Sequence, residues 1–236
     1  MDFYTLYRTL EEFNLEIFTL NDVIKITGQK KDVVTSSLSR WVKQGKVVRL
    51  KNQYYSLKDI ETKFLYQKLF KNTYVGLHAA LEYYESTTQR FNNLDLVTKN
   101  ILKDQMIGNV RVNFHKVKKD LFFGFEKIRI SNTEIFISNI EKTIIDCTYF
   151  SSKVYLSEIN TFIQTTKEKI DVELLLIYLR KINSMVLNKR VGYLLEKNGI
   201  FISDVEINNK YDRLNVNLGE NGKRDNHWKL ILNEEL

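Results

Sequence analysis

Hydrophobic positions recur at helical spacing along the first part of the chain. Three stretches have this period, at residues 3–14, 19–28 and 31–44. The third stretch carries one apolar stripe, formed by Val34, Leu38, Trp41 and Val42. Gly28 and Gly45 lie where the second and third stretches end, as expected of residues that terminate helices. The pattern therefore predicts three short helices.

Two short runs rich in β-branched and aromatic residues follow the third stretch. They lie at residues 46–50 and 53–56, with Lys51 and Asn52 between them as a turn. Three helices followed by a basic hairpin are the order of a winged helix-turn-helix. We expect residues 1–58 to form this DNA-binding unit and residues 59–72 to form a connecting helix.

The remainder, residues 73–236, alternates between short strands and helices. One helix is expected at residues 75–85. Strands are expected at residues 94–98, 110–117, 121–123, 127–130, 134–137, 213–216 and 228–232. Further helices are expected at residues 139–149, 155–164, 171–182 and 185–198. The predicted fold class is α+β, an N-terminal winged helix-turn-helix followed by a larger mixed α/β domain.

Composition excludes several classes of protein. With 236 residues, 43% of them hydrophobic, the chain has enough apolar area to exclude disorder. No apolar run approaches the ~20 residues of a membrane span, and no signal peptide precedes the first helix. The single cysteine, Cys147, excludes a disulfide framework within the chain. We expect a cytoplasmic protein without a membrane partner.

The positive charge is concentrated in the predicted winged unit. The stretch from Lys30 to Lys51 contains seven basic residues and one acidic residue, a net charge of +6. The net charge of the whole chain is +7. Such concentration is typical of nucleic-acid binding. A third helix that enters the major groove needs small polar and basic residues on its outer face, and the hairpin needs basic residues for the phosphates. The candidate DNA-binding residues are Lys30, Lys31, Ser36, Ser39, Arg40, Lys43, Arg49 and Lys51.

Residues that could support catalysis or metal binding are few. His78 and Glu82 share a predicted helix face, but two ligands are too few for a metal and we interpret them as a surface or capping pair. Glu141 fits a capping box that begins at Ser138. We interpret Cys147 as a small buried apolar group. We therefore expect no catalytic residue, no metal and no cofactor, and we do not expect an enzyme.

Four later segments carry a more specific pattern when they are taken in order. They are Gly76-Leu77-His78-Ala79-Ala80-Leu81-Glu82-Tyr83-Tyr84, Glu141-Lys142-Thr143-Ile144-Ile145-Asp146, Arg190-Val191-Gly192-Tyr193-Leu194-Leu195-Glu196 and Asn226-His227-Trp228. Together with the winged-helix pattern at residues 18–57, this ordered set resembles the AbiEi antitoxin family, the antitoxin half of AbiE abortive-infection systems. The resemblance covers about residues 18–233.

The resemblance implies a DNA-binding antitoxin that represses its own toxin–antitoxin operon. The N-terminal unit would bind double-stranded DNA at inverted repeats in the promoter. The larger domain would counteract a co-encoded nucleotidyltransferase toxin, without a stable complex being required. Such a toxin or its RNA substrate would present negative charge, so we expect a basic antitoxin face on the surface of the late helices. Its candidates are Arg180, Lys181, Lys189 and Arg190.

Two other functions stay open at this point. One is a stand-alone winged-helix transcriptional regulator whose C-terminal domain senses a ligand or a partner. The other is a nucleic-acid-processing enzyme that uses the winged helix for targeting. The next reading frame downstream distinguishes the antitoxin from the stand-alone regulator, because a Gly-Ser…Asp-x-Asp/Glu nucleotidyltransferase pattern there would favour the antitoxin.

Overall fold

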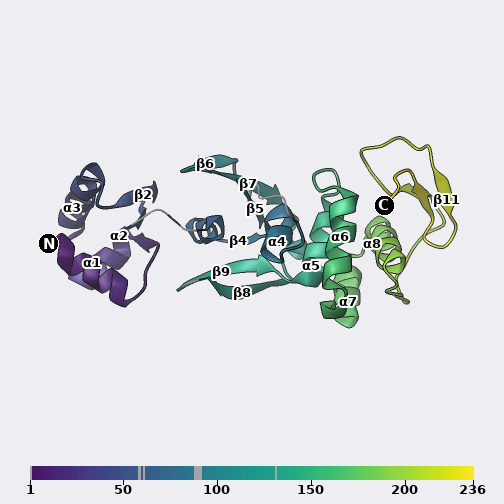
Figure 1. Ribbon diagram of the computed structural model, residues 1–236, viewed down its shortest axis with the longest axis horizontal. Coiled ribbons are helices and arrows are strands. Elements are labelled where there is room, and N and C mark those ends of the chain that lie inside the picture. The colour runs from purple at the N-terminus through teal and green to yellow at the C-terminus, as the bar shows by residue number, and fades with distance from the viewer. Residues whose placement is uncertain (1, 58–59, 61, 88–91, 131) are drawn as a thin grey trace.

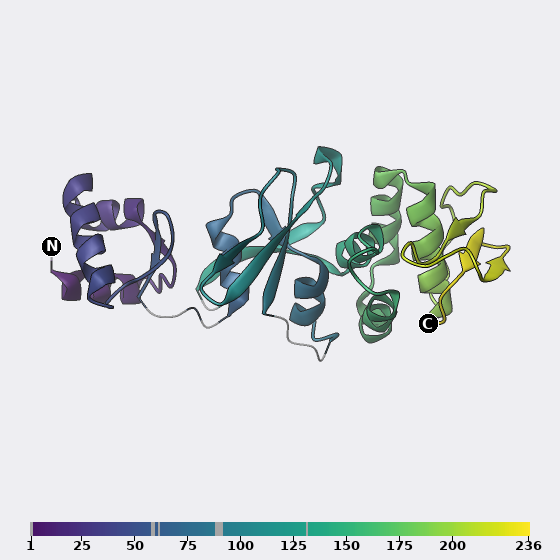
Figure 2. The same cartoon turned by 90° about the horizontal axis from the view of Figure 1, so that it is seen from above.

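The computed structural model describes residues 2–57, 60, 62–87, 92–130 and 132–236, and its elements follow one another along an elongated molecule (Figures 1 and 2). Small helices and a hairpin lie at the N-terminal end, and a larger sheet lies in the middle. A group of helices and a second small sheet complete the C-terminal end. The fold is α+β, as the sequence pattern predicts.

The N-terminal unit consists of helices packed beside a small antiparallel sheet. The helices are α1 (Phe3–Glu12), α2 (Leu20–Thr27) and α3 (Lys31–Lys43). The strands, in their order in the sheet, are β1 (Phe18–Thr19), β3 (Tyr54–Ser56) and β2 (Val48–Lys51). The helices and the hairpin lie where the pattern predicts them. β1 was not predicted, because two residues are too few for an alternating signal.

Local signals start and end the helices of this unit. At the start of α2, Thr19 Oγ1 accepts from the Asp22 backbone N–H at 3.1 Å, and Asp22 accepts from the Thr19 backbone N–H at 2.8 Å. This reciprocal capping box satisfies two N–H groups that the helix itself leaves unpaired. Gly28 ends the helix with φ +65°, a conformation that glycine adopts without steric cost.

The connecting helix expected at residues 59–72 is instead a shorter 3-10 helix, η1 (Lys63–Leu69). It is bonded to the central sheet: Gln67 Nε2 donates to the Thr73 carbonyl at 2.8 Å, and its Oε1 accepts from the Phe136 backbone N–H at 3.3 Å. Short 3-10 segments are typical of such connections. Residues 58, 59 and 61, where the predicted domain boundary falls, lie outside the described residues.

The central sheet has the strand order β6-β7-β5-β4-β9-β8 within the described residues. The strands are β4 (Thr73–Val75), β5 (Asn93–Thr98), β6 (Gln105–Ile107), β7 (Val110–Lys116), β8 (Phe125–Ile130) and β9 (Thr133–Ser138). β5 and β7 run parallel, with Asp95 opposite Asn113 and Val97 opposite His115. The other neighbouring pairs are antiparallel, apart from the short parallel contact between β4 and β9.

Two sequence predictions in this region are wrong in detail, and one strand was missed. Residues 121–123 are not a strand: Leu121 ends the 3-10 turn η2 (Lys119–Leu121), and the ring of Phe122 packs on that of Tyr74. The helix expected from residue 75 begins later, as α4 (Leu77–Tyr83), after strand β4. β6 was not predicted, because its three residues carry no clear alternation.

The C-terminal half is built around one buried helix. The helices are α5 (Ile140–Tyr149), α6 (Leu156–Thr166), α7 (Val172–Ile182) and α8 (Met185–Lys197), with the 3-10 turn η3 (Lys167–Lys169) after α6. α5 contacts α4, α6, α7, α8 and strand β9, and its residues 141–148 are all buried. A small sheet closes the chain, with β10 (Asp212–Arg213), β12 (Leu230–Leu232) and β11 (Lys223–Asp225) in that order.

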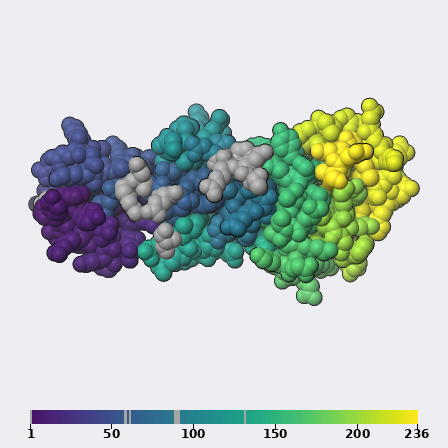
Figure 3. Space-filling model, in the orientation of Figure 1, coloured from purple at the N-terminus to yellow at the C-terminus, as the bar shows by residue number. Residues whose placement is uncertain are grey.

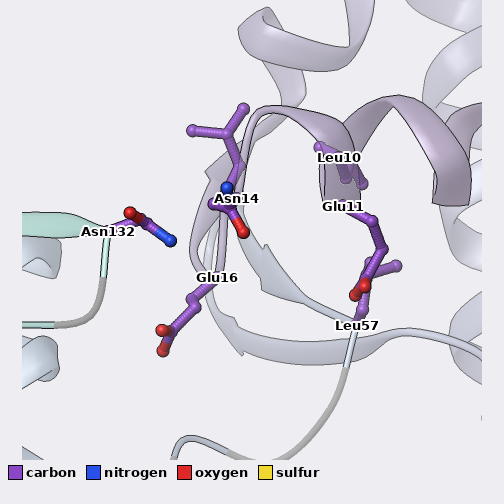
Figure 4. A pocket seen from close by; sticks show the side chains of 7 residues that line it. Leu10, Glu11, Asn14, Glu16, Leu57 and Asn132 are labelled. Atoms are coloured by element: carbon purple, nitrogen blue, oxygen red, sulfur yellow. The ribbon is translucent and has the colours of Figure 1, made fainter.

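The N-terminal unit packs against the central sheet. Ile17, Leu50 and Tyr54 belong to the hydrophobic cluster that covers one face of that sheet together with η1. Beside this contact, Figure 4 shows a small pocket of about 140 Å³, in which Asn132 from the β8–β9 turn faces Asn14 and other residues of the N-terminal unit. The two parts of the molecule therefore share apolar surface.

Candidate nucleic-acid interface

The outer face of α3 is polar and basic. Val34, Leu38 and Trp41 are buried in the N-terminal core. The side of α3 that faces away from this core is exposed and carries Ser36, Ser39, Arg40 and Lys43. Ser36 and Arg40 also line a shallow depression on the same surface. The helical periodicity therefore predicted correctly which side of α3 is exposed.

Basic residues also lie at both ends of this surface. Lys30 and Lys31 are exposed at the start of α3, and Arg49 is exposed on strand β2. The Arg49 guanidinium donates to Asn52 Oδ1 at 3.1 Å, so it rests along the hairpin turn. In the space-filling view (Figure 3), the N-terminal residues, coloured purple to blue, form one end of the molecule.

Lys51 differs from the free hairpin lysine that we expected. Its Nζ lies 3.9 Å from the centroid of the Phe70 ring, at the end of η1. The side chain is half-buried, and burial lowers the pKa of its ammonium group. A cation over an aromatic ring is stabilised by the ring quadrupole. Lys51 therefore contacts the central part of the chain as well as the hairpin.

Two of the four expected antitoxin-face residues are exposed. Arg180 and Lys181 lie in the last turn of α7, where basic side chains interact favourably with the helix dipole. The Nζ of Lys181 is 4.1 Å from the centroid of the Phe123 ring. These two residues form a small basic surface on the helical part of the molecule.

Lys189 and Arg190 correct the expectation of a wholly exposed basic face. Lys189 is 0% exposed, and its Nζ donates to Asn208 Oδ1 at 2.7 Å and to Asp212 Oδ2 at 2.6 Å. Arg190 is half-buried, and its guanidinium donates to the Arg213 carbonyl at 2.8 and 2.9 Å. Both side chains fix the C-terminal segment onto α8. Periodicity missed this because the partners lie about twenty residues further along the chain.

One of the segments that carry the family resemblance, residues 141–146, contains a buried ion pair. Lys142 and Asp146, one turn apart on α5, form a salt bridge, and both side chains are buried. Tyr74 on β4 donates to Asp146 Oδ2 at 2.7 Å and accepts from Lys142 Nζ at 3.1 Å. Burial raises the pKa of Tyr74, and the nearby Asp146 carboxylate raises it further. This triad connects the sheet to α5.

Glu141 has a role different from the one that the sequence suggested. The residue that caps α5 is Asn139, whose Oδ1 accepts from the Lys142 backbone N–H at 2.9 Å. Glu141 instead reaches across to α7, where its Oε1 accepts from the Asp171 backbone N–H at 2.8 Å. Asp171 is itself the N-cap of α7. The Ser138 capping-box interpretation is therefore wrong, and Glu141 connects α5 to the start of α7.

The segment around Gly192 holds the closing strands against α8. A Cβ at Gly192 would overlap the ring of Trp228, so only glycine leaves room for the indole at its present distance. The Trp228 indole N–H donates to Glu196, one turn further along α8. Two separate resemblance segments, on α8 and at the chain end, thus meet in space and form one packed contact.

A cluster of charged and polar residues that the sequence analysis missed lies where β5 and β7 meet α4. Asp95 is buried, and its Oδ1 accepts from His115 Nε2 at 2.8 Å and from Asn113 Nδ2 at 3.1 Å. His78 Nδ1 lies 3.6 Å from the other Asp95 oxygen. Burial alone would raise the pKa of Asp95, but the hydrogen bond from His115 and the nearby His78 ring outweigh it and hold that pKa well below its usual value. The sequence did contain one indication of this cluster: Asp95 is an acidic residue inside the apolar run of residues 94–97.

The predicted pairing of His78 with Glu82 is also wrong. Glu82 Oε2 forms an ion pair at 2.5 Å with Lys63 of η1, while the other ring nitrogen of His78, Nε2, lies 3.4 Å from Glu158 on α6. Among the described residues, no three His, Cys, Asp or Glu side chains form a group that could hold a metal ion. Cys147 is fully buried in α5, as expected. Within the described parts of the chain, no helix is long and apolar enough to cross a bilayer.

Comparison with known proteins gives a structural likeness without a family assignment. No protein-family model and no curated protein sequence matches the chain. The fold is similar to that of the RV2827C protein from Mycobacterium tuberculosis, known from a crystal structure. The TM-score is 0.61 at 9% sequence identity, and the match covers 96% of this chain and 89% of that chain. At this identity the likeness extends to the fold alone.

Proposed function

We propose that the N-terminal unit is a winged helix that binds double-stranded DNA. The observation that carries this proposal is the exposed face of α3, where Ser36, Ser39, Arg40 and Lys43 lie together in a stretch with six excess positive charges. An α-helix fits the major groove, which is ~12 Å wide. On this proposal α3 enters the groove, and Arg49 reaches a flanking phosphate from the hairpin.

The contacts divide into two kinds on this proposal. Ser39 and Arg40, on the outer face of α3, read base edges. Lys30, Lys31 and Arg49 neutralise phosphates, which supplies affinity without sequence preference. Lys51 contributes less than a free lysine, because it already rests on Phe70.

We further propose that the protein is an AbiEi-type antitoxin. On this proposal it represses its own toxin–antitoxin operon through inverted repeats and counteracts a co-encoded nucleotidyltransferase toxin. Support for this proposal comes from the ordered resemblance segments. The packing contacts of their residues, Glu141 with Asp171, Lys142 with Asp146, and Gly192 with Trp228, have a structural explanation and do not bear on it. The alternative is a stand-alone regulator that uses the same DNA-binding unit. In that case the neighbouring gene would not encode a nucleotidyltransferase toxin.

A mobility-shift titration of the protein against its own promoter fragment tests the DNA proposal. If four to six basic groups meet phosphates, log K falls with log[salt] at a slope of about −4 to −5. Arg40→Ala is expected to change which sequence is preferred, by about 1–3 kcal/mol per lost base contact. Arg49→Ala is expected to weaken binding to all duplexes equally.

Lys169→Ala is the matched control for these variants. Lys169 is exposed on η3, far along the chain from α3, and its removal also lowers the net charge by one. We expect this variant to bind the promoter as the unchanged protein does. A salt slope near zero, or no shift of the promoter fragment at micromolar protein, would contradict the proposal.

A further inference from the structure

A second concave site lies in the central part of the molecule, away from α3. It is a cavity of about 310 Å³ where β5 and β7 meet α4 and the α5–α6 connection. This volume lies at the lower end of the range of small-molecule sites, about 300–1,000 Å³. The lining is mostly polar and consists of His78, Asn93, Asp95, Asp104, Asn113, Phe114, His115 and Lys153.

The hydrogen-bond partners fix the state of His115. Its Nε2 lies 2.8 Å from a carboxylate oxygen of Asp95, so Nε2 carries the proton and donates. In the neutral ring Nδ1 then has a free lone pair, and it lies 3.1 Å from Lys153 Nζ. In this tautomer Nδ1 accepts from the Lys153 side chain, so the Asp95–His115 pair positions Lys153 at the cavity.

Charge pairing distinguishes Lys153 from the other charged groups of the lining. Asp95 is bound by His115 and Asn113, and His78 lies between Asp95 and Glu158. Asp104 accepts from the Phe114 backbone N–H at 2.9 Å, and Arg111 lies 4.0 Å from its other oxygen. By contrast, no described carboxylate lies within 4.0 Å of Lys153 Nζ, whose hydrogen-bond partner is the neutral ring. Among the described residues, Lys153 is thus a positioned cation of this cavity without an anionic partner.

We propose that this cavity binds a small ligand through a phosphate group, with Lys153 as its direct partner and the amides of Asn93 and Asn113 as further donors. An ammonium group is a compact point charge that suits a phosphate. The carboxylates of the lining already accept hydrogen bonds from protein groups. The groups that remain to bind a ligand are therefore mainly hydrogen-bond donors.

Inorganic phosphate and a 5′-mononucleotide share the chemistry that this site recognises, and the volume accommodates either. The inference is independent of DNA binding, since none of its residues lies on α3 or the hairpin. It also differs from the proposed antitoxin face, since Arg180 and Lys181 do not line the cavity. The failure of either function would therefore leave this proposal to be judged on its own test.

The test is a titration of the full-length protein with inorganic phosphate and, separately, with AMP, followed by NMR chemical shifts and by calorimetry. We expect saturable binding of at least one of the two. Lys153→Met is expected to weaken that binding by about 10- to 100-fold, the loss typical of a hydrogen bond to a charged group. Lys153→Arg is expected to retain part of it, because the charge remains.

Lys169→Met is the matched control, since Lys169 is another exposed lysine and lies outside the cavity. Thermal melting checks folding, and because Lys153 is exposed its variants are expected to keep the melting temperature. Tighter binding of AMP than of phosphate would assign the ligand to nucleotides, and equal binding would assign it to the phosphate group alone. No binding of either at millimolar concentration, or equal binding by Lys153→Met and the unchanged protein, overturns the proposal.

Discussion

Single buried residues in the larger domain hold charges that a sequence pattern alone would assign to the surface. Lys142 and Asp146 are buried together and share Tyr74 as a third partner. Replacing Asp146 with Ala leaves an ammonium group buried without its counter-charge. We expect this change to lower the free energy of unfolding by about 3–5 kcal/mol, measured by urea denaturation.

Tyr74→Phe is the control for that prediction. It removes only a hydroxyl from the same triad, and we expect a loss of about 1–2 kcal/mol. Equal losses for the two variants would mean that the ion pair contributes no more than the hydroxyl does, which would contradict a charge-based explanation.

Gly192 gives a second prediction at the residue scale. A methyl group there would overlap the Trp228 ring, so Gly192→Ala must push the indole away from α8. We expect a loss of about 1–3 kcal/mol, typical of an overpacked core, together with a change in tryptophan fluorescence. Gly219→Ala is the matched control, because its added Cβ meets no atom within 4 Å. A normal melting temperature for Gly192→Ala would argue against the close contact.

At the scale of elements, His78 connects three of them. It belongs to α4 and lies between Asp95 of β5 and Glu158 of α6. The Asp95 carboxylate, 3.6 Å from the ring, raises the pKa of His78 more than burial lowers it. A raised pKa means that the folded state holds this proton more tightly than the unfolded state does.

A pH dependence of stability follows from that direction. Protonated His78 contributes fully to the free energy of unfolding below about pH 6.5, the pKa of histidine in the unfolded chain. This contribution is lost as the pH rises through the higher pKa of His78 in the folded state. We expect the difference in unfolding free energy between the unchanged protein and His78→Gln to shrink from about pH 6 to about pH 9. Urea denaturation at several pH values measures it. A difference that grows with pH would contradict the assignment.

At the scale of the whole molecule, the proposed functions lie in different parts of the chain. The outer face of α3 is at one end, and the helical part lies beyond the central sheet (Figure 1). We expect a full-length Arg40→Ala/Lys43→Ala variant to lose repression of a promoter reporter and still protect cells that express the neighbouring toxin. Loss of both activities in a folded variant would contradict this separation.

The exposed pair on α7 gives the complementary prediction. Because Lys189 and Arg190 are packed against the C-terminal segment, only Arg180 and Lys181 test a basic antitoxin face cleanly. We expect Arg180→Ala/Lys181→Ala to reduce protection from the toxin and to leave promoter binding unchanged. Full protection by this variant, with a normal melting temperature, would remove the α7 face from the proposal. Failure of the unchanged protein to protect would remove the antitoxin proposal.

Features that depend on neighbours along the chain can be predicted from the amino-acid sequence. Helical periodicity identified the buried and exposed sides of α3, and Thr19, Asp22 and Gly28 marked the ends of α2. These signals are local, because a helix brings residues three and four apart to one face and a cap involves residues within one turn. The mixed α+β class followed from the same periodicities.

Which polar residues are buried, and which partners they have, depends instead on the packing of distant segments. Lys189 meets Asp212, Glu141 meets Asp171, and His115 meets Asp95 and Lys153 across separations that no local period encodes. The parallel register of β5 and β7 brings the last of these clusters together. A buried charge is stable only beside its partner, so its role depends on the packing of distant segments and not on its own place in the sequence.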